Sequence, residues 1–329
     1  MIKGILSILW KAVFIVLAVS LVLSHMSPSF SDAARAHISL PVRNFFAALT
    51  NGIAFPAFEL IALFLILSIP FLVWRFILGR GRLSALLLVL QLFVGGYAVT
   101  EGIDLSAEPI EYVASPTDEE YLEALRLCAE SLGGLDEVRD ADEDYSRVGE
   151  TVHRYALDTL GVSTSFIPRA KTSLLSSLLT RLGTLAYYPP LTAEAIINAD
   201  APGFMRISSY SHELMHFFGI MRENEATFFS TVALISSEDS ELEYAGYITA
   251  YISIGSKVYG WKSEEYRKIE ANLPTRVKKD LAERSDFLRK ASSSSSDSQS
   301  AACLEELVGD SSYGDASRLI AAYLLGQTL

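Results

Sequence analysis

The chain has 329 residues, which is enough for a membrane part and one sizeable globular domain. Half of the residues are hydrophobic and the mean hydropathy is +0.29, which is high for a purely soluble protein. The net charge is −12, and acidic residues are dense between positions 101 and 150. Because an acidic domain repels phosphate backbones, the composition argues against a nucleic-acid partner.

Three apolar runs lie in the first hundred residues, at about 4–23, 57–78 and 83–99. A membrane-spanning helix needs about 20 apolar residues, or about 17 if it is well flanked. The pattern therefore predicts a membrane domain, residues 1–100, with three transmembrane helices and lipid as a partner. The first run resembles a signal peptide, but no small-residue cleavage site follows it before Ser27-Pro28, so we expect an uncleaved anchor.

Basic residues near the spans predict the orientation of the chain, since positive charges stay on the cytoplasmic side. One group of basic residues lies at the start of the chain, and the other lies between the second and third apolar runs. If both groups are cytoplasmic, the protein is a multi-pass protein of the cell membrane and residues 101–329 lie outside the cytoplasm. Arg35 and Arg43, in the first external loop, count against this orientation. The residues that favour it are Lys3, Lys11, Arg75, Arg80 and Arg82.

Residues 101–329 have the pattern of amphipathic helices. Thr117 followed by Glu120 predicts a capping box at the start of a helix that runs to Gly133-Gly134. Further helices are expected at about 145–160, 173–182, 208–289 and 316–325, with a serine-rich loop at 291–301. Strand character is confined to about 193–198. The fold class is therefore mainly α with a small β element.

The segment His212-Glu213-Leu214-Met215-His216 is an HExxH motif. Two histidines at i and i+4 lie on one face of a helix, so both imidazoles can reach one ion, and zinc accepts neutral imidazole nitrogens readily. The glutamate beside the first histidine can act as general base on a zinc-activated water. The motif therefore predicts a Zn²⁺ site with Glu213 as the catalytic residue and His212 and His216 as ligands.

A catalytic zinc needs a third protein ligand and one open position. Gly219 can end the motif helix in a left-handed turn and return the chain. Glu223 and Glu225 are then the nearest carboxylates, which makes the site gluzincin-like. Arg222 stands where the metzincin pattern needs histidine and disfavours that class. The more distant alternatives are Glu238, Glu241 and Glu243.

At these residues the chain resembles a bacterial family of membrane-anchored proteins, domain of unknown function 3810, whose pattern is HELxH-xx-G-xxx-ExEAN. The resemblance implies a zincin-like metallopeptidase domain over residues 101–329, with an unassigned substrate. By analogy with other zincins, in which the first Glu of an ExxA(D/N) helix binds zinc, it favours Glu223 as the third ligand and makes Glu225 a group that orients a histidine. Other matching segments are Lys171, Leu182-Gly183, Tyr188-Pro189, Leu191-Thr192-Ala193-Glu194-Ala195, Tyr244-Ala245-Gly246-Tyr247 and Ser312-Tyr313-Gly314.

The chain departs from the family pattern in two places. Thr227 stands where the family usually has asparagine, and Gly95-Gly96-Tyr97 matches poorly the stretch that follows the last span. We expect neither departure to touch the zinc ligands.

Several other residues are candidates for supporting roles. Glu194 can hydrogen-bond a ligand histidine or a substrate backbone, or it is an ordinary polar strand residue. The segment that carries it can bind an extended peptide as an edge strand. Tyr244 is a candidate for oxyanion stabilisation, as are Tyr210 and Tyr247. Cys128 and Cys303 match no metal spacing, and are either two buried thiols or, in an oxidising compartment, a pair.

We therefore expect a membrane-anchored zinc metallopeptidase that hydrolyses peptide bonds in a protein or peptide outside the cytoplasm. Two alternatives stay open. One is a non-catalytic membrane-bound zinc-binding sensor or scaffold, although such a protein needs no general base. The other is hydrolysis of a different amide, such as a cell-wall peptide. The sequence leaves the cleavage specificity, the regulation and the oligomeric state undetermined.

Overall fold

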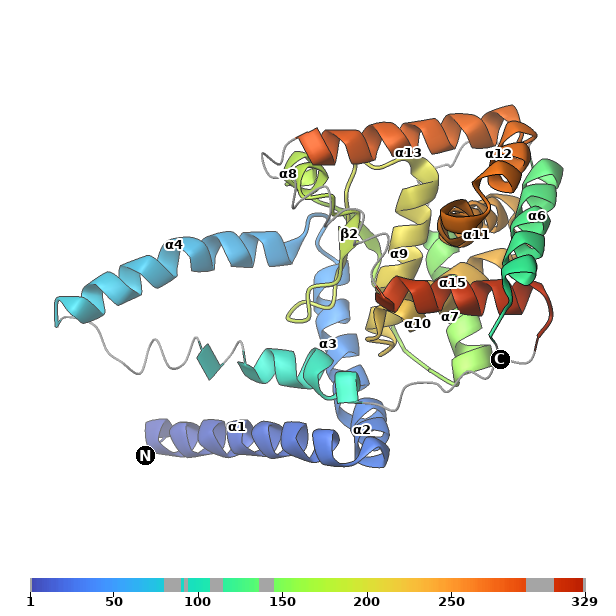
Figure 1. Ribbon diagram of the computed structural model, residues 1–329. Coiled ribbons are helices and arrows are strands. Elements are labelled where there is room, and N and C mark those ends of the chain that lie inside the picture. Colours follow the sequence, from blue (N-terminus) through green and yellow to red (C-terminus); the bar gives the residue numbers. More distant parts are fainter. Residues whose placement is uncertain are drawn as a thin grey trace.

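The computed structural model describes residues 2–79, 90–91, 94–106, 115–135, 145–293 and 311–327. Over these residues the chain is mainly helical, with one small sheet, as predicted (Figure 1). The N-terminal helices form one side of the molecule, and the later helices pack into a compact body on the other. The N-terminal helices are α1 (Ile2–Met26), α2 (Pro28–Ala34), α3 (Leu40–Asn51) and α4 (Ala57–Ile77).

One helix of the described chain, α4, is long and apolar enough to cross a membrane, and none of its apolar stretch is buried. The first predicted span lies in α1, whose described apolar part, Ile15–Met26, is shorter. The third predicted span, residues 83–99, falls largely outside the described residues. Of the three predicted spans, the structure therefore supports the one in α4.

The segment after the third predicted span returns to the body through one π-helical turn, η2 (Ala98–Gly102), and a short 3₁₀ turn, η3 (Asp104–Ser106). The N-terminal helices are fastened to the body by buried contacts: Ala47 of α3 belongs to the main hydrophobic core, and Arg43 forms a fully buried ion pair with Asp104. Residues 1–100 and 101–329 therefore share a core.

The body consists of nine described helices. The predicted capping box is present at the start of α6, and α7 ends at Leu160, as predicted; the structure adds that Gly161 after it is left-handed. Several boundaries differ from prediction. Helix α15 begins at Ser311 instead of at about 316. Helix α8 begins only at Ser176, because Ser173 and Leu174 are held by Glu59 of α4, and α9 begins at Gly203, directly after Pro202. The bounds are α6 Asp118–Gly134, α7 Ser146–Leu160, α8 Ser176–Arg181, α9 Gly203–Phe217, α10 Glu223–Ile235, α11 Ser240–Trp261, α12 Ser263–Ala271, α13 Thr275–Ser293 and α15 Ser311–Leu324.

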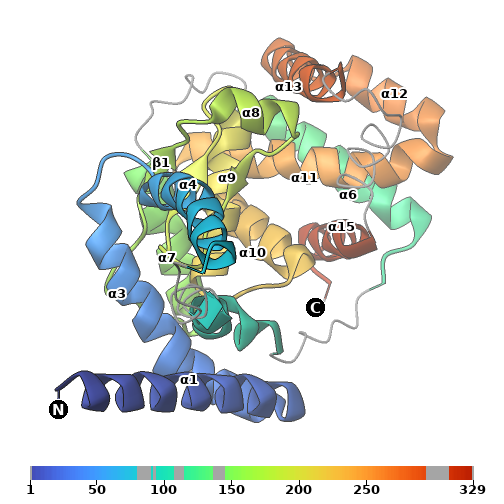
Figure 2. The same cartoon turned by 90° about the vertical axis from the view of Figure 1, so that its left-hand side faces the viewer.

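The sheet has the order β1-β3-β2. Strand β3 (Ala195–Ile197) is fully buried at the centre, where the sequence predicts strand character. It pairs in parallel with β1 (Ala170–Thr172) and antiparallel with β2 (Ala186–Tyr187). Helix α9 packs against this sheet and against α7, α10 and α11, so the HExxH helix lies at the centre of the molecule (Figure 2).

Candidate metal centre

The HExxH motif occupies the last two turns of α9, and the helix is anchored there by apolar residues on its other faces. Leu214, Met215 and Phe217 have no solvent exposure and belong to the main core. Because those side chains are buried in the core, the rotation of α9 about its axis is fixed. The i, i+4 spacing then places the imidazoles of His212 and His216 side by side, with ring centroids 4.7 Å apart.

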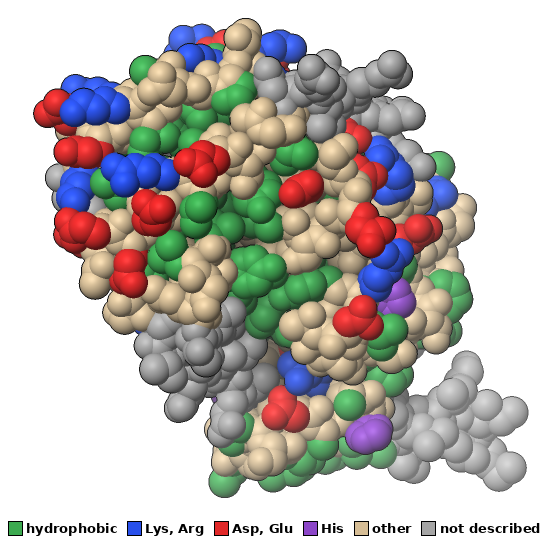
Figure 3. Space-filling model, turned by 90° about the vertical axis from the view of Figure 1, so that its right-hand side faces the viewer, with side chains coloured by type: hydrophobic (Ala, Val, Ile, Leu, Met, Phe, Trp, Pro, Cys, Tyr) green, Lys and Arg blue, Asp and Glu red, His purple; other side chains and the backbone are tan. Residues whose placement is uncertain are grey.

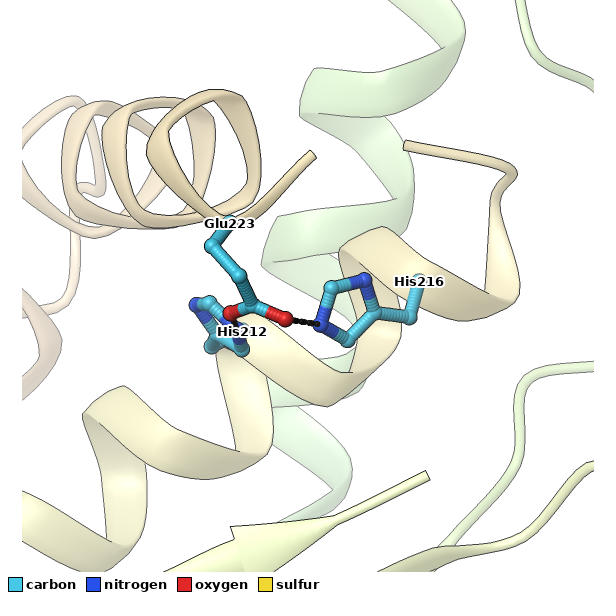
Figure 4. Close-up of side chains that lie close together, drawn as sticks. All are labelled: His212, His216 and Glu223. Atoms are coloured by element: carbon cyan, nitrogen blue, oxygen red, sulfur yellow. Dashed lines mark hydrogen bonds and ion pairs between the residues drawn. The ribbon is translucent and has the colours of Figure 1, made fainter. Parts of the chain in front are cut away.

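A tight turn after α9 returns the chain to the same place. Gly219 has φ +98°, a conformation that disfavours any residue with a Cβ atom. The turn leads into α10, whose first residue is Glu223. Its carboxylate lies between the two rings, 3.0 Å from Nε2 of His212 and 3.5 Å from Nε2 of His216 (Figure 4).

The other ring nitrogens of the two histidines have their own partners. Nδ1 of His216 donates to the carbonyl oxygen of Ile220 at 2.8 Å. Nδ1 of His212 lies 3.3 Å from the hydroxyl of Thr227, one turn further along α10 than Glu223. Such partners orient ligand histidines and select the tautomer with Nε2 toward the ion. Our expectation that Thr227 touches no ligand is therefore wrong.

The donor atoms fit a zinc ion. One ring nitrogen of each histidine and one carboxylate oxygen of Glu223 lie within 4.8 Å of one another. Tetrahedral coordination with zinc–ligand distances of about 2.0–2.2 Å requires ligand atoms separated by about 3.3–3.5 Å. The carboxylate makes separations of this order with its two different oxygens: Oε2 lies 3.0 Å from Nε2 of His212, and Oε1 lies 3.5 Å from Nε2 of His216.

Charge and burial shift the pKa values of all three groups. Burial, and next the charge of His212, lower the pKa of His216 to about 4. Burial also disfavours protonation of His212, but its hydrogen bond with Glu223 and the charge of Glu213 produce a net increase in its pKa. Burial raises the pKa of Glu223. The hydrogen bond from His212 and the charges of both histidines outweigh burial and lower this pKa to about 2.

Glu213 follows His212 in the sequence and lines the same cleft as His212, His216 and Glu223. It is 7% exposed. Burial is the main cause that raises its pKa to about 7; the charge of His212 opposes this, and Glu223 and Glu101 add to it. A carboxyl group with a pKa near neutrality can both accept and release a proton under ordinary conditions.

The site opens into a cleft of about 1330 Å³. Its floor is α9 with its histidines, and its walls include the segment of residues 183–188 that contains β2, the helices α11 and α13, and the turn η2. Glu101 of η2 borders the cleft, and burial together with the charges of Asp104 and Glu223 raises its pKa against the opposing effect of Arg43. The segment that leads from the N-terminal helices into the body thus contributes a carboxylate to the wall of the cleft.

Tyr188 lies on the same wall. Its ring is 8% exposed, and its hydroxyl has no hydrogen-bond partner among the residues that the structure describes. Burial raises its pKa, and the charges of Arg43, Glu101 and Glu213 also act on it. Tyr188 is therefore a phenol close to the charged groups of the site.

The remaining predicted site residues lie elsewhere. Glu225 is buried on the first turn of α10, but Glu223 supplies the oxygen near the histidines. Glu194 binds Lys171 and the backbone at the start of α4. The hydroxyl of Tyr244 donates to Asp280 of α13 at 2.6 Å.

Two further groups are engaged away from the site. Glu241, one of the more distant alternative ligands, accepts from Arg147 at 2.8 Å. Cys128 is a fully buried free thiol, which fits the first of the two alternatives, and Cys303 lies outside the described residues.

Sequence reasoning missed the orienting groups and two residues of the cleft wall. Ile220 acts through its backbone, so its side chain carries no signal. Thr227 was visible as a polar residue one turn after Glu223 on the same helix face. Glu101 and Tyr188 reach the cleft only through tertiary packing.

No curated protein and no solved structure matches the chain. A family model described as "Protein of unknown function (DUF3810)" matches residues 37–303, which covers α3, the HExxH motif and α13. This range is more than half of the chain, and it includes every residue of the candidate metal centre. The chain therefore belongs to the DUF3810 family of proteins of unknown function.

Proposed function

We propose that this protein is a membrane-anchored zinc metallopeptidase with a zincin-like catalytic domain. His212, His216 and Glu223 hold the metal, and Glu213 handles the proton. The membrane anchor is α4, and the substrate is a protein or peptide that lies across the cleft.

One contact carries the proposal. The proton of a neutral His216 resides on Nδ1, because that atom donates to the carbonyl of Ile220. Its Nε2 then bears a lone pair, yet it faces an oxygen of Glu223 at 3.5 Å. Two acceptors facing each other repel unless a proton or a cation lies between them. Because burial disfavours protonation of His216, a metal cation is the better occupant.

The residues then have separate roles. Zinc, when bound, lowers the pKa of a water molecule from about 15.7 to about 7. Glu213, buried next to His212, can take up a proton and deliver it to the leaving amine. Thr227 and the carbonyl of Ile220 fix the orientations of the two imidazole rings.

The test measures zinc content and peptide cleavage on the full-length protein in detergent. We expect about one zinc per chain, retained in Glu213→Gln, and a loss of at least 100-fold in cleavage rate for that variant. Glu264→Gln, an exposed substitution on α12, is the matched control and should retain full activity.

Two outcomes would contradict the proposal. A protein that stays metal-free when supplied with zinc would remove the metal site. Zinc binding without cleavage of any peptide, in wild type and Glu213→Gln alike, would favour a non-catalytic sensor or scaffold.

A further inference from the structure

The start of α4 is fastened to the body by two buried carboxylates. Glu194, which precedes β3, accepts hydrogen bonds from the backbone N–H groups of Ala57 and Phe58 at 2.9 and 2.8 Å. Lys171 of β1 lies 2.5 Å from the same carboxylate and neutralises it. The first turn of α4 is therefore held in a fixed position against the sheet.

Glu59, on that first turn, holds the other side. Its carboxylate accepts from the hydroxyl of Ser173 at 2.5 Å, the backbone N–H of Leu174 at 2.8 Å and the hydroxyl of Tyr187 at 2.9 Å. The loop before α8 and the strand β2 are thus attached to the foot of α4. Tyr187 also borders the cleft, so the attachment reaches the wall of the candidate site.

The length of α4 determines where a bilayer surface would lie. Its 21 residues span about 31 Å at about 1.5 Å per residue, and the hydrocarbon core of a bilayer is about 30 Å thick. The helix is therefore just long enough to cross the hydrocarbon core. A bilayer crossed by α4 must therefore begin at its first turn, level with Glu59.

Exposed apolar side chains surround this foot on two sides. On α3, Phe45 and Leu49 are 60% and 57% exposed, while Arg43 and Ala47 on the opposite face are buried. On the other side lie four leucines at and beside α8, all about half exposed or more. They are Leu174 (59%), Leu175 (50%), Leu178 (49%) and Leu182 (62%).

Both elements lie on the face of the molecule from which α4 projects. In Figure 2, α4 points toward the viewer, with α3 on one side of it and α8 on the other. The opposite face carries both acidic and basic side chains, which surround a central apolar area (Figure 3). An apolar surface on the anchor side and charges on the far side are the distribution expected of a domain that rests on a membrane.

We propose that the apolar collar, defined as Phe45 and Leu49 of α3 and Leu174, Leu175, Leu178 and Leu182 at α8, docks on the bilayer surface and inserts its side chains at the level of the lipid headgroups. The collar and α4 then form one continuous lipid contact. The inference rests on the membrane anchoring in the proposed function, but it is independent of zinc and of catalysis.

The docked collar sets the height of the cleft above the membrane. Leu182 is followed directly by Gly183, the first residue of the β2 wall. The cleft wall would therefore lie at the bilayer surface. At this height the cleft can admit a segment of another membrane-bound protein, close to the point where that protein enters the bilayer.

Site-specific fluorescence tests the docking. The full-length protein carries Cys303→Ser, and Cys128 is fully buried, so a single engineered cysteine takes the label. An environment-sensitive fluorophore at Leu178→Cys is compared with one at Leu157→Cys on α7, a leucine that is 45% exposed. In Figures 1 and 2 helix α7 lies away from α8, and in Figure 1 it lies beyond α9 on the side opposite to α4. Leu67→Cys, at the middle of α4, reports membrane insertion.

After reconstitution into phosphatidylcholine nanodiscs, quenching by lipids with a headgroup-proximal nitroxide is measured. We expect quenching at Leu178→Cys to exceed that at Leu157→Cys several-fold, and Leu67→Cys to be quenched by nitroxides placed deep in the acyl chains. Quenching at Leu178→Cys no greater than at Leu157→Cys would overturn the docking.

The reporters separate the possible failures. Quenching at position 67 without quenching at position 178 would leave α4 as an anchor and reject the collar. Absence of quenching at both positions would reject the anchoring and, with it, the docking. A label at position 178 shielded from both lipid nitroxide and aqueous iodide would indicate that a protein surface covers the collar, which also overturns the proposal.

Discussion

At the scale of single residues, the site depends on which atom of each histidine is occupied by a partner. The carbonyl of Ile220 binds Nδ1 of His216, and the hydroxyl of Thr227 lies by Nδ1 of His212. Both Nε2 atoms are thereby directed to the carboxylate of Glu223. Two predictions follow from this arrangement.

Glu223→Gln should weaken zinc binding far more than Glu225→Gln. Both glutamates lie in the first turn of α10, but only the carboxylate of Glu223 lies between the imidazoles. We expect a loss of at least 100-fold in zinc affinity for Glu223→Gln and of less than about tenfold for Glu225→Gln, measured by competition with a chelator. The reverse order would identify Glu225 as the ligand.

Thr227→Val should lower zinc affinity by about 10-fold, because it removes the hydroxyl beside His212 and leaves the volume nearly unchanged. Thr227→Asn, which restores the residue usual in the family, should retain the affinity of the wild type. Equal affinities for all three proteins would show that Thr227 does not orient the ring.

At the scale of elements, the return of the chain from α9 to α10 brings the third donor to the site. Gly219 enables this return in two ways. Its φ of +98° disfavours other residues, and an added Cβ would lie 2.7 Å from Cδ of Arg35 and 3.0 Å from Nη2 of Arg43. The N-terminal helices therefore pack directly on the turn of the metal centre.

Gly219→Ala should lower the free energy of unfolding by about 1–3 kcal/mol and weaken zinc binding. Gly161→Ala is the matched control, since that glycine has φ +65° but no atom within 4 Å of an added Cβ. It should cost only about 1 kcal/mol and leave zinc affinity unchanged. Thermal unfolding and metal titration of both variants separate backbone strain from the contact with Arg35.

At the scale of the whole molecule, one side carries α4 and its apolar collar, and the metal centre opens into a cleft whose wall is attached to that side. The buried pair Lys171–Glu194 and the contacts of Glu59 make this attachment rigid. If α4 anchors the protein as proposed, the position of the membrane and that of the site are coupled.

A peptide tethered to lipid should be cleaved several-fold faster than the same peptide free in solution by the protein in nanodiscs. Replacing Leu174, Leu175, Leu178 and Leu182 together by glutamine should remove this preference while leaving cleavage of the free peptide unchanged, since none of the four borders the cleft. Equal loss toward both peptides would indicate a general defect of the fold.

The sequence alone was sufficient for the features that depend on local spacing. The i, i+4 histidines, the capping box of α6, the position where α7 ends and the apolar run of α4 are all set by neighbouring residues, and the structure contains each of them. Even the nearness of Glu223 to the histidines follows from a short loop in which Gly219 turns the chain back.

Contacts between residues far apart in the chain arise only when the whole molecule packs. Glu59 meets Ser173 over 114 residues, and Glu194 meets Ala57 over 137, so no periodicity could place them. Glu194 and Tyr244, expected near the metal centre, instead hold α4 and α13. Local patterns determine which face a side chain takes on its own helix, whereas the packing of apolar cores determines which helices meet, and that depends on the whole chain at once.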